Sequence, residues 1–171
     1  LALNIRRPMP RPQDEYSRRG TAFHLWIEKH FRAATLFDDD DLDFLDPLEP
    51  DQTLEQLKNA WLASDWAPRI PVAVEVPFEA VIGGVLVRGR IDAVYEINGR
   101  YEVIDWKTGS TKLGQSSAVQ LAVYRLAWAN LKGIDPTQVS AAFHYVPSGE
   151  TDRPADLLSH AQLVDLLMGS A

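Results

Sequence analysis

Hydrophobic positions recur along the chain with two different periods, one typical of helices and one typical of strands. In residues 20–37, Phe23, Ile27 and Phe31 fall every fourth residue, which places them on one face of a helix. Residues 116–133, SSAVQLAVYRLAWANLKG, repeat that period and end in a glycine, the usual residue after a helix C-terminus. Both stretches predict amphipathic helices.

Two shorter helices are predicted from capping boxes, in which Ser or Thr and a Gln three residues later satisfy the first backbone N–H groups of a helix. Thr53 and Gln56 open a helix that runs through Trp61. Ser159 and Gln162 open a last helix near the end of the chain.

Strands are predicted where hydrophobic and polar residues alternate. These stretches are residues 71–81, 85–97, 100–109 and 139–146. Asn98-Gly99, between the second and third, is a strong signal for a two-residue type I′ hairpin. The order of elements is helix, helix, three strands, helix, strand, helix. It predicts an α/β domain of the mixed α+β kind, with a central mixed sheet flanked by helices.

Composition fits one globular domain: 171 residues, 46% hydrophobic and 24% charged. No apolar run approaches the roughly 18 residues that a membrane span needs, and no basic-then-apolar leader precedes the helices. The absence of cysteine excludes disulfides, thiolate zinc sites, iron–sulfur clusters and a cysteine nucleophile. A cytoplasmic setting without membrane contact is therefore expected. The opening Leu-Ala-Leu suggests a piece of a longer chain.

The formal charge of −7 would argue against a polyanionic partner if it were evenly spread. However, residues 38–51 hold eight carboxylates and no base, and removing them leaves +1 for the rest of the chain. Residues 38–52 are expected to form a solvated acidic loop, and residues 1–18 a basic arm or linker rich in Pro and Arg. Net charge therefore does not exclude nucleic acid.

The predicted hairpin brings three charged residues together. If Ile97 faces Arg100, the register places Asp92 opposite Asp105, with Cβ atoms about 4.5–5.5 Å apart. Lys107, two residues beyond Asp105, shares that face. Paired carboxylates repel each other unless a cation lies between them, and Mg²⁺ often uses one or two such groups. A surface hairpin in which Lys107 merely neutralises one acid is the alternative.

Two further pairs share the helical i, i+4 spacing. His24 and Glu28 lie on one face of the first helix, and Gln120 and Tyr124 lie on one face of the helix after Lys107. Taken alone, each pair would be an ordinary set of polar helix positions.

The ordered set of motifs resembles the RecB-type nucleases of the PD-(D/E)XK superfamily. The motifs are Gly20-x-x-x-His24-x-x-x-Glu28, Gly89-x-x-Asp92, Asp105-x-Lys107 and Gln120-x-x-x-Tyr124. The resemblance runs over about residues 19–147 and implies a restriction-endonuclease-like core with a catalytic hairpin, in a nuclease domain at residues 19–171. More narrowly, the chain is similar to the C-terminal nuclease domain of actinobacterial helicase–nucleases of the AdnAB kind. No proline precedes Asp92, which departs from the superfamily's name.

The resemblance also implies roles for individual residues. The metal ligands would be His24, Asp92, Asp105 and the carbonyl of Trp106. The catalytic set would be Asp92, Asp105, Lys107, Gln120 and Tyr124. The ion would be Mg²⁺ or Mn²⁺, since imidazole suits transition metals better.

Other residues are assigned more loosely. Glu28 would orient His24. Glu75, on the strand before the hairpin, lies in the neighbourhood of the family's site. The tryptophans at positions 26, 61, 66 and 128 are expected in the core rather than as base-stacking platforms.

The function implied is metal-dependent hydrolysis of DNA phosphodiester bonds, in DNA end processing and double-strand break repair. The DNA would be single strands delivered by a helicase motor of the same longer chain, beside a partner helicase–nuclease subunit. No G-x-x-x-x-G-K loop occurs, so no ATP site is expected within these residues. Two alternatives are a catalytically inactive copy that binds DNA or acts as a scaffold, and an unrelated metal hydrolase of small molecules.

Overall fold

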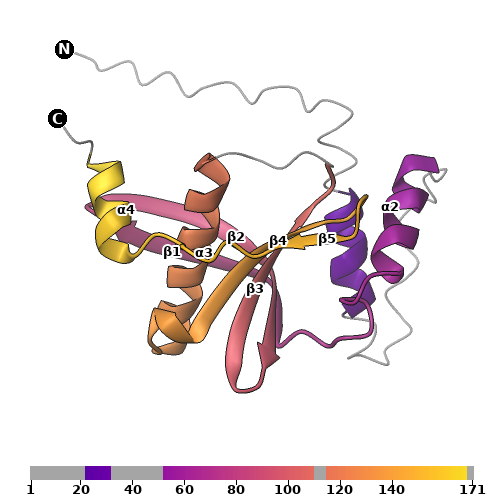
Figure 1. Ribbon diagram of the computed structural model, residues 1–171, viewed down its shortest axis with the longest axis horizontal. Helices are drawn as coiled ribbons and strands as arrows, with labels where there is room; N and C mark the ends of the chain where they lie inside the picture. The colour runs from indigo at the N-terminus through magenta and orange to yellow at the C-terminus, as the bar shows by residue number, and fades with distance from the viewer. Residues whose placement is uncertain (1–21, 32–51, 110–114, 169–171) are drawn as a thin grey trace, which may run out of the picture.

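The computed structural model of the protein describes residues 22–31, 52–109 and 115–168. The strands are β1 (Ala73–Ile82), β2 (Val85–Ile97), β3 (Arg100–Lys107), β4 (Val139–Tyr145) and β5 (Glu150–Asp152). The helices are one at residues 22–31, drawn in indigo in Figure 1, followed by α2 (Gln52–Leu62), α3 (Gln115–Lys132) and α4 (His160–Leu167), with a 3₁₀ turn η1 at Pro136–Gln138. The predicted basic arm and the acidic residues 38–51 lie outside the described residues.

The strands form one sheet in the order β1-β2-β3-β4-β5. β3 and β4 are parallel, and the other neighbours are antiparallel. Parallel neighbours need a long crossover connection, which α3 supplies between β3 and β4. The mixed α+β class with a central mixed sheet, expected from the order of elements, is confirmed.

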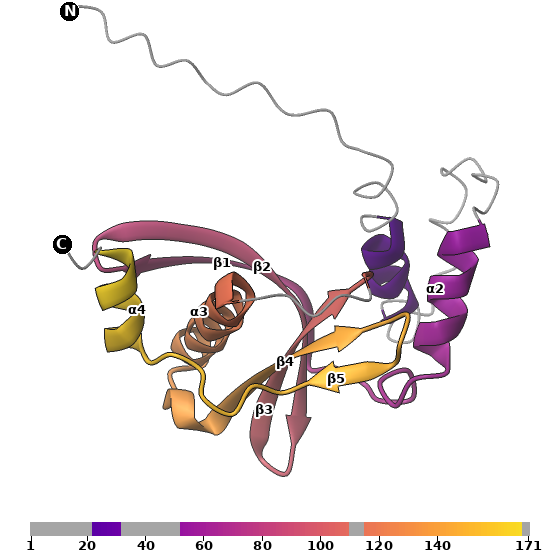
Figure 2. The same cartoon turned by 45° about the horizontal axis from the view of Figure 1, so that its top comes forward.

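Helices cover both faces of the sheet (Figures 1 and 2). On one face, α3 and α4 pack over a buried cluster that includes Phe78, Ile91, Val103, Leu121, Phe143 and Leu163. On the other face, the helix at residues 22–31 and α2 pack over a cluster that includes Phe23, Ile27, Phe31, Trp61, Ala93, Ile104 and Trp106. None of the helices within the described part of the chain is both long and apolar enough to cross a membrane.

The tryptophans lie in the core, as expected. Trp61, Trp66 and Trp128 are buried, and Trp26 is half-buried against the cluster under α2. The predicted helical face of Phe23, Ile27 and Phe31 is likewise buried.

The predicted hairpin turn is confirmed. Asn98 and Gly99 both have positive φ, 53° and 76°, which a type I′ turn requires. Ile97 pairs with Arg100, so the strands have the register expected from the sequence.

Some boundaries differ from expectation. α2 begins at Gln52, one residue before the predicted start at Thr53, and the Thr53 side chain of the predicted capping box lies outside what the structure describes. The Ser159–Gln162 capping box is present. The sequence did not predict β5, because three polar residues are too short to show alternation.

β1 changes the face toward which its side chains point at Glu75. Val74 packs against the cluster under α2, whereas Val76 packs against the cluster under α3. In a regular strand these two residues would share a face. Glu75 has a φ of 49° and is absent from the pairing with β2. The backbone irregularity at Glu75 therefore switches the strand from one layer to the other.

β2 makes the same switch directly opposite. Ala93 belongs to the cluster under α2 and Ile91 to the cluster under α3, with Asp92 between them and outside the pairing with β1. The outer part of this hairpin, residues 76–91, is here called the β1–β2 arm. Beyond the switch it curves over α3 toward α4 (Figure 2).

Gly89 in the arm is expected to be intolerant of a side chain. A Cβ there would lie 2.7 Å from Cζ of Phe78, its partner on β1, whose ring also meets that of Tyr124 edge-on at 5.5 Å. Gly89→Ala should force the Phe78 ring to move and lower the free energy of unfolding by about 1–3 kcal/mol. The midpoint of urea unfolding at constant m-value measures this loss.

Arg88→Ala is the matched control, because the neighbouring Arg88 side chain is 68% exposed. Its effect should stay within about 0.5 kcal/mol. Equal midpoints for Gly89→Ala and the unaltered protein would contradict the close packing.

Candidate active site

The site lies where the sheet forks. β2 and β3 pair from Ile97↔Arg100 up to Ala93↔Ile104, and there the pairing stops. β3 continues beside β4, while β2 continues into the β1–β2 arm. Asp92 and Asp105, which the extrapolated register would place opposite each other, therefore lie one step beyond the end of the ladder.

The Asp92 carboxylate fills the gap at the fork. Its Oδ2 accepts a hydrogen bond of 2.8 Å from the backbone N–H of Trp106. A side chain thus takes the place of the strand partner that β3 lacks at this position. This bond fixes one carboxylate oxygen and leaves the other to face a neighbouring helix.

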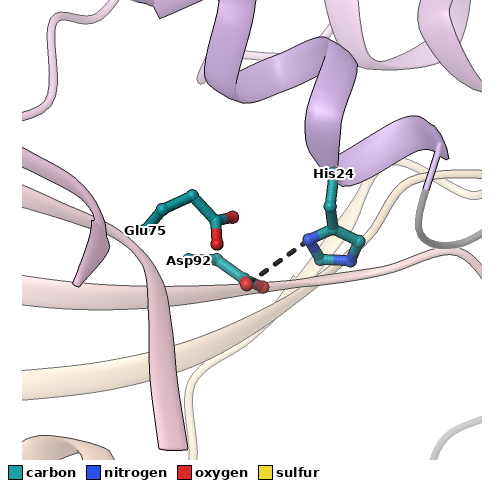
Figure 3. Close-up of side chains that lie close together, drawn as sticks. All are labelled: His24, Glu75 and Asp92. Carbon is teal, nitrogen blue, oxygen red and sulfur yellow. Dashed lines mark ion pairs between the residues drawn. The ribbon is translucent and has the colours of Figure 1, made fainter. Parts of the chain in front are cut away.

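Three side chains from different elements meet around Asp92 (Figure 3). His24 comes from the helix at residues 22–31, Glu75 from β1 and Asp92 from β2. One ligand atom of each lies within 4.8 Å of the others, and His24 Nδ1 is 3.3 Å from Asp92 Oδ1. His24 and Asp92, two of the residues expected as metal ligands, thus lie side by side, and Glu75 lies beside them.

A second chain of contacts leads from the fork into α3. Asp105 Oδ2 lies 2.7 Å from Lys107 Nζ. Lys107 donates to Gln120 Oε1 at 3.3 Å, and Gln120 Nε2 donates to the Tyr124 hydroxyl at 2.7 Å. Because Gln120 accepts with one end and donates with the other, it links Lys107 to Tyr124. The four residues form one polar line.

The group around Asp92 and the polar line that begins at Asp105 do not form one ligand cluster. Within the described residues, the group suited to a metal contains His24, Glu75 and Asp92, and Asp105 is not part of it. The Asp105 side chain is 7% exposed and lies against Lys107. Burial raises the pKa of Asp105, and the charge of the nearby Asp92 raises it further.

The Trp106 backbone faces the same fork. The carbonyl of the next residue, Lys107, accepts from Val146 N on the β4 side. Since successive residues alternate the side to which their N–H and C=O groups point, the Trp106 carbonyl points away from β4. The Trp106 indole is buried in the cluster under α2.

Burial and mutual repulsion raise the pKa values of the carboxyl groups. For Glu75, burial and then the charge of Asp92 raise the pKa to about 7, against an opposing effect of His24. The charge of Glu28 adds to this increase, which places Glu28 beside the site. For Asp105, burial and the charge of Asp92 raise the pKa well above its usual range, although Lys107 opposes them.

Burial acts on the pKa of the histidine in the opposite direction. Burial alone would lower the pKa of His24, but its hydrogen bond to Asp92 and the charges of Asp92, Asp105 and Glu75 outweigh burial, so the pKa is raised. In α3, burial and the charge of Asp105 raise the pKa of Tyr124 to about 12. Burial is the largest cause of the increase for Glu75, Asp105 and Tyr124, and for all four groups the negative charges at the fork raise the pKa.

The donor set fits a divalent cation. Partly buried carboxylates that repel one another gain stability from a positive ion between them. Oxygen donors suit Mg²⁺, and an added imidazole nitrogen suits Mn²⁺ as well.

Glu75 is the residue that the sequence assigned least firmly. The signal for it was nonetheless present in the Gly83-Gly84 turn. Ile82 pairs with Val85 across that turn, and counting back along both strands places Glu75 opposite Asp92. The same counting that related Asp92 to Asp105 would thus have added Glu75.

Comparison with known proteins agrees with this geometry. The sequence profile of the PD-(D/E)XK nuclease superfamily matches residues 2–163, and the chain belongs to that superfamily. A crystal structure from Eubacterium rectale, of a protein described as a proposed exonuclease, has a TM-score of 0.52 at 14% identity. The matched region covers 92% of this chain and 65% of the Eubacterium rectale chain. At 14% identity the similarity supports the fold alone.

Curated relatives come from mycobacteriophages. The Gene 69 protein of Mycobacterium phage D29 is 35% identical over 94 residues, and the Gene 69 protein of phage L5 is 35% identical over 82 residues. The matches cover 55% and 48% of this chain. They cover 32% and 27% of the relatives, so the matched part spans less than a third of either relative.

Glu75→Gln removes one carboxylate from the site and keeps the shape of the side chain. In the metal-free protein the pKa of Glu75 rises from 4.5 to about 7 on folding. Ionisation of Glu75 therefore lowers the stability of the folded protein as pH rises from 4.5 through 7. In EDTA, E75Q should be more stable than wild type at pH about 8, and the difference should shrink toward pH about 5. Thermal unfolding at both pH values measures it.

The same variants test whether Glu75 holds an ion. Mn²⁺ at a hundred times its Kd should stabilise the wild type by about 2.7 kcal/mol and E75Q by less. The exposed Glu96 provides a control, since Glu96→Gln removes the same charge from the far part of β2. Equal stabilisation of E75Q and wild type by Mn²⁺ would remove Glu75 from the metal site.

Proposed function

We propose that the chain is a metal-dependent deoxyribonuclease domain that hydrolyses phosphodiester bonds. The observation that carries the proposal is the fork, where His24, Glu75 and Asp92 converge beside an Asp105–Lys107 ion pair. Membership of a nuclease superfamily supports DNA as the substrate. The ion would be held by His24, Asp92, Asp105 and the Trp106 carbonyl, with Glu75 as an added ligand.

When bound, Mg²⁺ or Mn²⁺ supplies Lewis-acid stabilisation of the phosphate and makes water more acidic. The remaining chemistry belongs to the chain itself. Lys107 carries a positive charge at the edge of the carboxylate group, 22% exposed, where it can donate to a water or to a phosphate oxygen. Its charge would stabilise the negative charge that develops on the phosphate.

Gln120 and Tyr124 would act by positioning Lys107. The Gln120 carboxamide accepts from Lys107, and its other end is held by Tyr124. Tyr124 in turn lies against Phe78 of the β1–β2 arm. The ammonium group is thus held between α3 and the fork. Glu28, four residues after His24 on the same helix, would orient the imidazole.

We further propose that residues 19–171 form the nuclease module of a longer ATP-dependent helicase–nuclease of the RecB or AdnAB kind, acting in DNA end processing and double-strand break repair. The order and spacing of the motifs support this. A motor domain would deliver a single strand to the fork, beside a partner subunit. ATP-driven degradation of DNA ends by the full-length protein would distinguish this role from that of a free-standing nuclease.

The nuclease activity has a direct test. Labelled single-stranded DNA should be cleaved in Mg²⁺ or Mn²⁺ and remain intact in EDTA. Asp105→Asn should abolish cleavage, because the change removes a carboxylate charge from the fork without changing its shape. Gel analysis of the products measures both. Binding of DNA without cleavage under all three conditions would instead indicate an inactive DNA-binding copy.

Lys107→Met separates chemistry from binding. The variant keeps much of the side-chain length but loses the charge, and a protonated lysine does not ligate a metal. Metal affinity should therefore stay near wild type. The cleavage rate should fall by about 10² or more, the effect of removing a preorganised electrostatic group. Single-turnover cleavage with saturating enzyme measures the chemical step.

Lys132→Met is the matched control, because Lys132 is exposed at the far end of α3. It removes the same charge from a position on α3 away from the fork and should cleave at the wild-type rate. Wild-type cleavage by Lys107→Met would show that Lys107 only balances the charge of Asp105.

A further inference from the structure

The outer face of the β1–β2 arm carries arginines that lead away from the fork. The side chains of Phe78, Ile82 and Val87 pack inward against α3 and α4. Because side chains alternate along a strand, the intervening residues point outward. Arg88 and Arg90 are among these, and their side chains are 68% and 59% exposed.

No described element covers this outer face. α3 and α4 lie on the inner side of the arm, and the helix at residues 22–31 and α2 lie beyond the fork (Figure 2). A shallow groove of about 280 Å³ runs along the arm, lined by Pro77, Phe78, Glu79, Arg88 and Gly89.

The arginines are continuous with the candidate site. Arg90 lies two residues from Asp92 on β2, and its Nε is 3.8 Å from Glu75 Oε2. Arg88 lies two residues further out. Alternate residues of a strand are about 7 Å apart, so Asp92, Arg90 and Arg88 form a regular series. A stretched single strand presents its phosphates at a similar spacing.

Each arginine forms an ion pair with a glutamate, Arg88 with Glu79 and Arg90 with Glu75. Arg88 Nε is 2.8 Å from Glu79 Oε1, and both side chains are more than 60% exposed. Such exposed pairs contribute little and exchange readily for another anion. Glu75, the partner of Arg90, also belongs to the group of His24, Glu75 and Asp92 that could hold a metal ion, so the Arg90 guanidinium can bind a second anion. A phosphate is the anion that guanidinium groups bind best in geometry and charge.

From these observations we propose that Arg88 and Arg90 bind the phosphate backbone of the DNA strand next to the scissile bond. The strand runs outward from the fork along the outer face of the β1–β2 arm. The inference rests on the proposed nuclease function and adds the path of the substrate. Glu79 limits the affinity of this path, because it competes with phosphate for Arg88.

The test is the binding of a fluorescent single-stranded oligonucleotide in EDTA, measured by anisotropy over a series of salt concentrations. Arg88→Ala and Arg90→Ala should each weaken binding about fivefold or more, and each should flatten the salt dependence by about 0.7 in log–log slope. Arg90→Lys should keep the slope, because it keeps the charge. Glu79→Gln should bind more tightly than wild type, because it releases Arg88.

Arg100→Ala is the control for net charge. Arg100 is exposed at the start of β3, beside the end of β2 that is far from the arm, and it donates to the Thr137 carbonyl at 2.9 Å. It should change affinity less than twofold. Wild-type affinity and slope in the Arg88→Ala/Arg90→Ala double variant would overturn the path. An equal loss in Arg100→Ala would also overturn it, since the effect would then be one of overall charge.

Single-turnover cleavage in Mn²⁺ separates this inference from the proposed function. With enzyme below saturation the double variant should cleave more slowly than the wild type, in proportion to its weaker DNA binding, whereas Arg100→Ala should cleave at the wild-type rate. Cleavage by wild type with unchanged DNA binding in the double variant overturns the path and leaves the nuclease function standing. Weakened DNA binding in the double variant, with no cleavage by wild type, supports the path and overturns the nuclease function.

Discussion

The crowding of negative charge at the fork of the sheet is the constraint on which the site depends. Glu75, Asp92 and Asp105 lie in one row across β1, β2 and β3, partly or fully buried. Their pKa values shift upward where shifts occur, because burial and proximity both disfavour a further negative charge. Each of the three carboxylates lies against a basic side chain: His24 beside Asp92, Arg90 beside Glu75 and Lys107 beside Asp105. The group of His24, Glu75 and Asp92 has the donor atoms and the spacing that could hold a divalent ion.

The fork also explains how two helical layers reach one site. His24 approaches Asp92 from the layer of the helix at residues 22–31, whereas Gln120 reaches Lys107 from α3 on the opposite face. A continuous sheet would separate these layers. Here β2 leaves β3 after Ala93, and the opening lets side chains from both faces meet at one edge.

Interrupting two strand ladders at one row costs backbone hydrogen bonds, and several contacts offset that cost. Asp92 accepts from the Trp106 N–H that β2 no longer pairs. On either side of the row, hydrophobic clusters anchor both strands, one under α2 and one under α3. The bend that follows carries the β1–β2 arm over α3 and leaves its other face open. The interruption of the strands at Glu75 and Asp92 therefore brings these two carboxylates together with His24. It also leaves Arg88 and Arg90 of the arm exposed.

The sequence by itself determined the features that depend on local geometry. The Asn98-Gly99 turn fixed the register of β2 with β3, because a two-residue type I′ turn allows only one pairing. Strand alternation placed Lys107 beside Asp105, whereas His24 was assigned to the site only by the resemblance to a nuclease family. Only the tertiary structure decided where the ladders end and that Asp105 lies outside the group of His24, Glu75 and Asp92. Those outcomes depend on β1 and β2 bending to pack on α3 while their inner ends pack under α2, which is a balance of long-range contacts that no local pattern encodes.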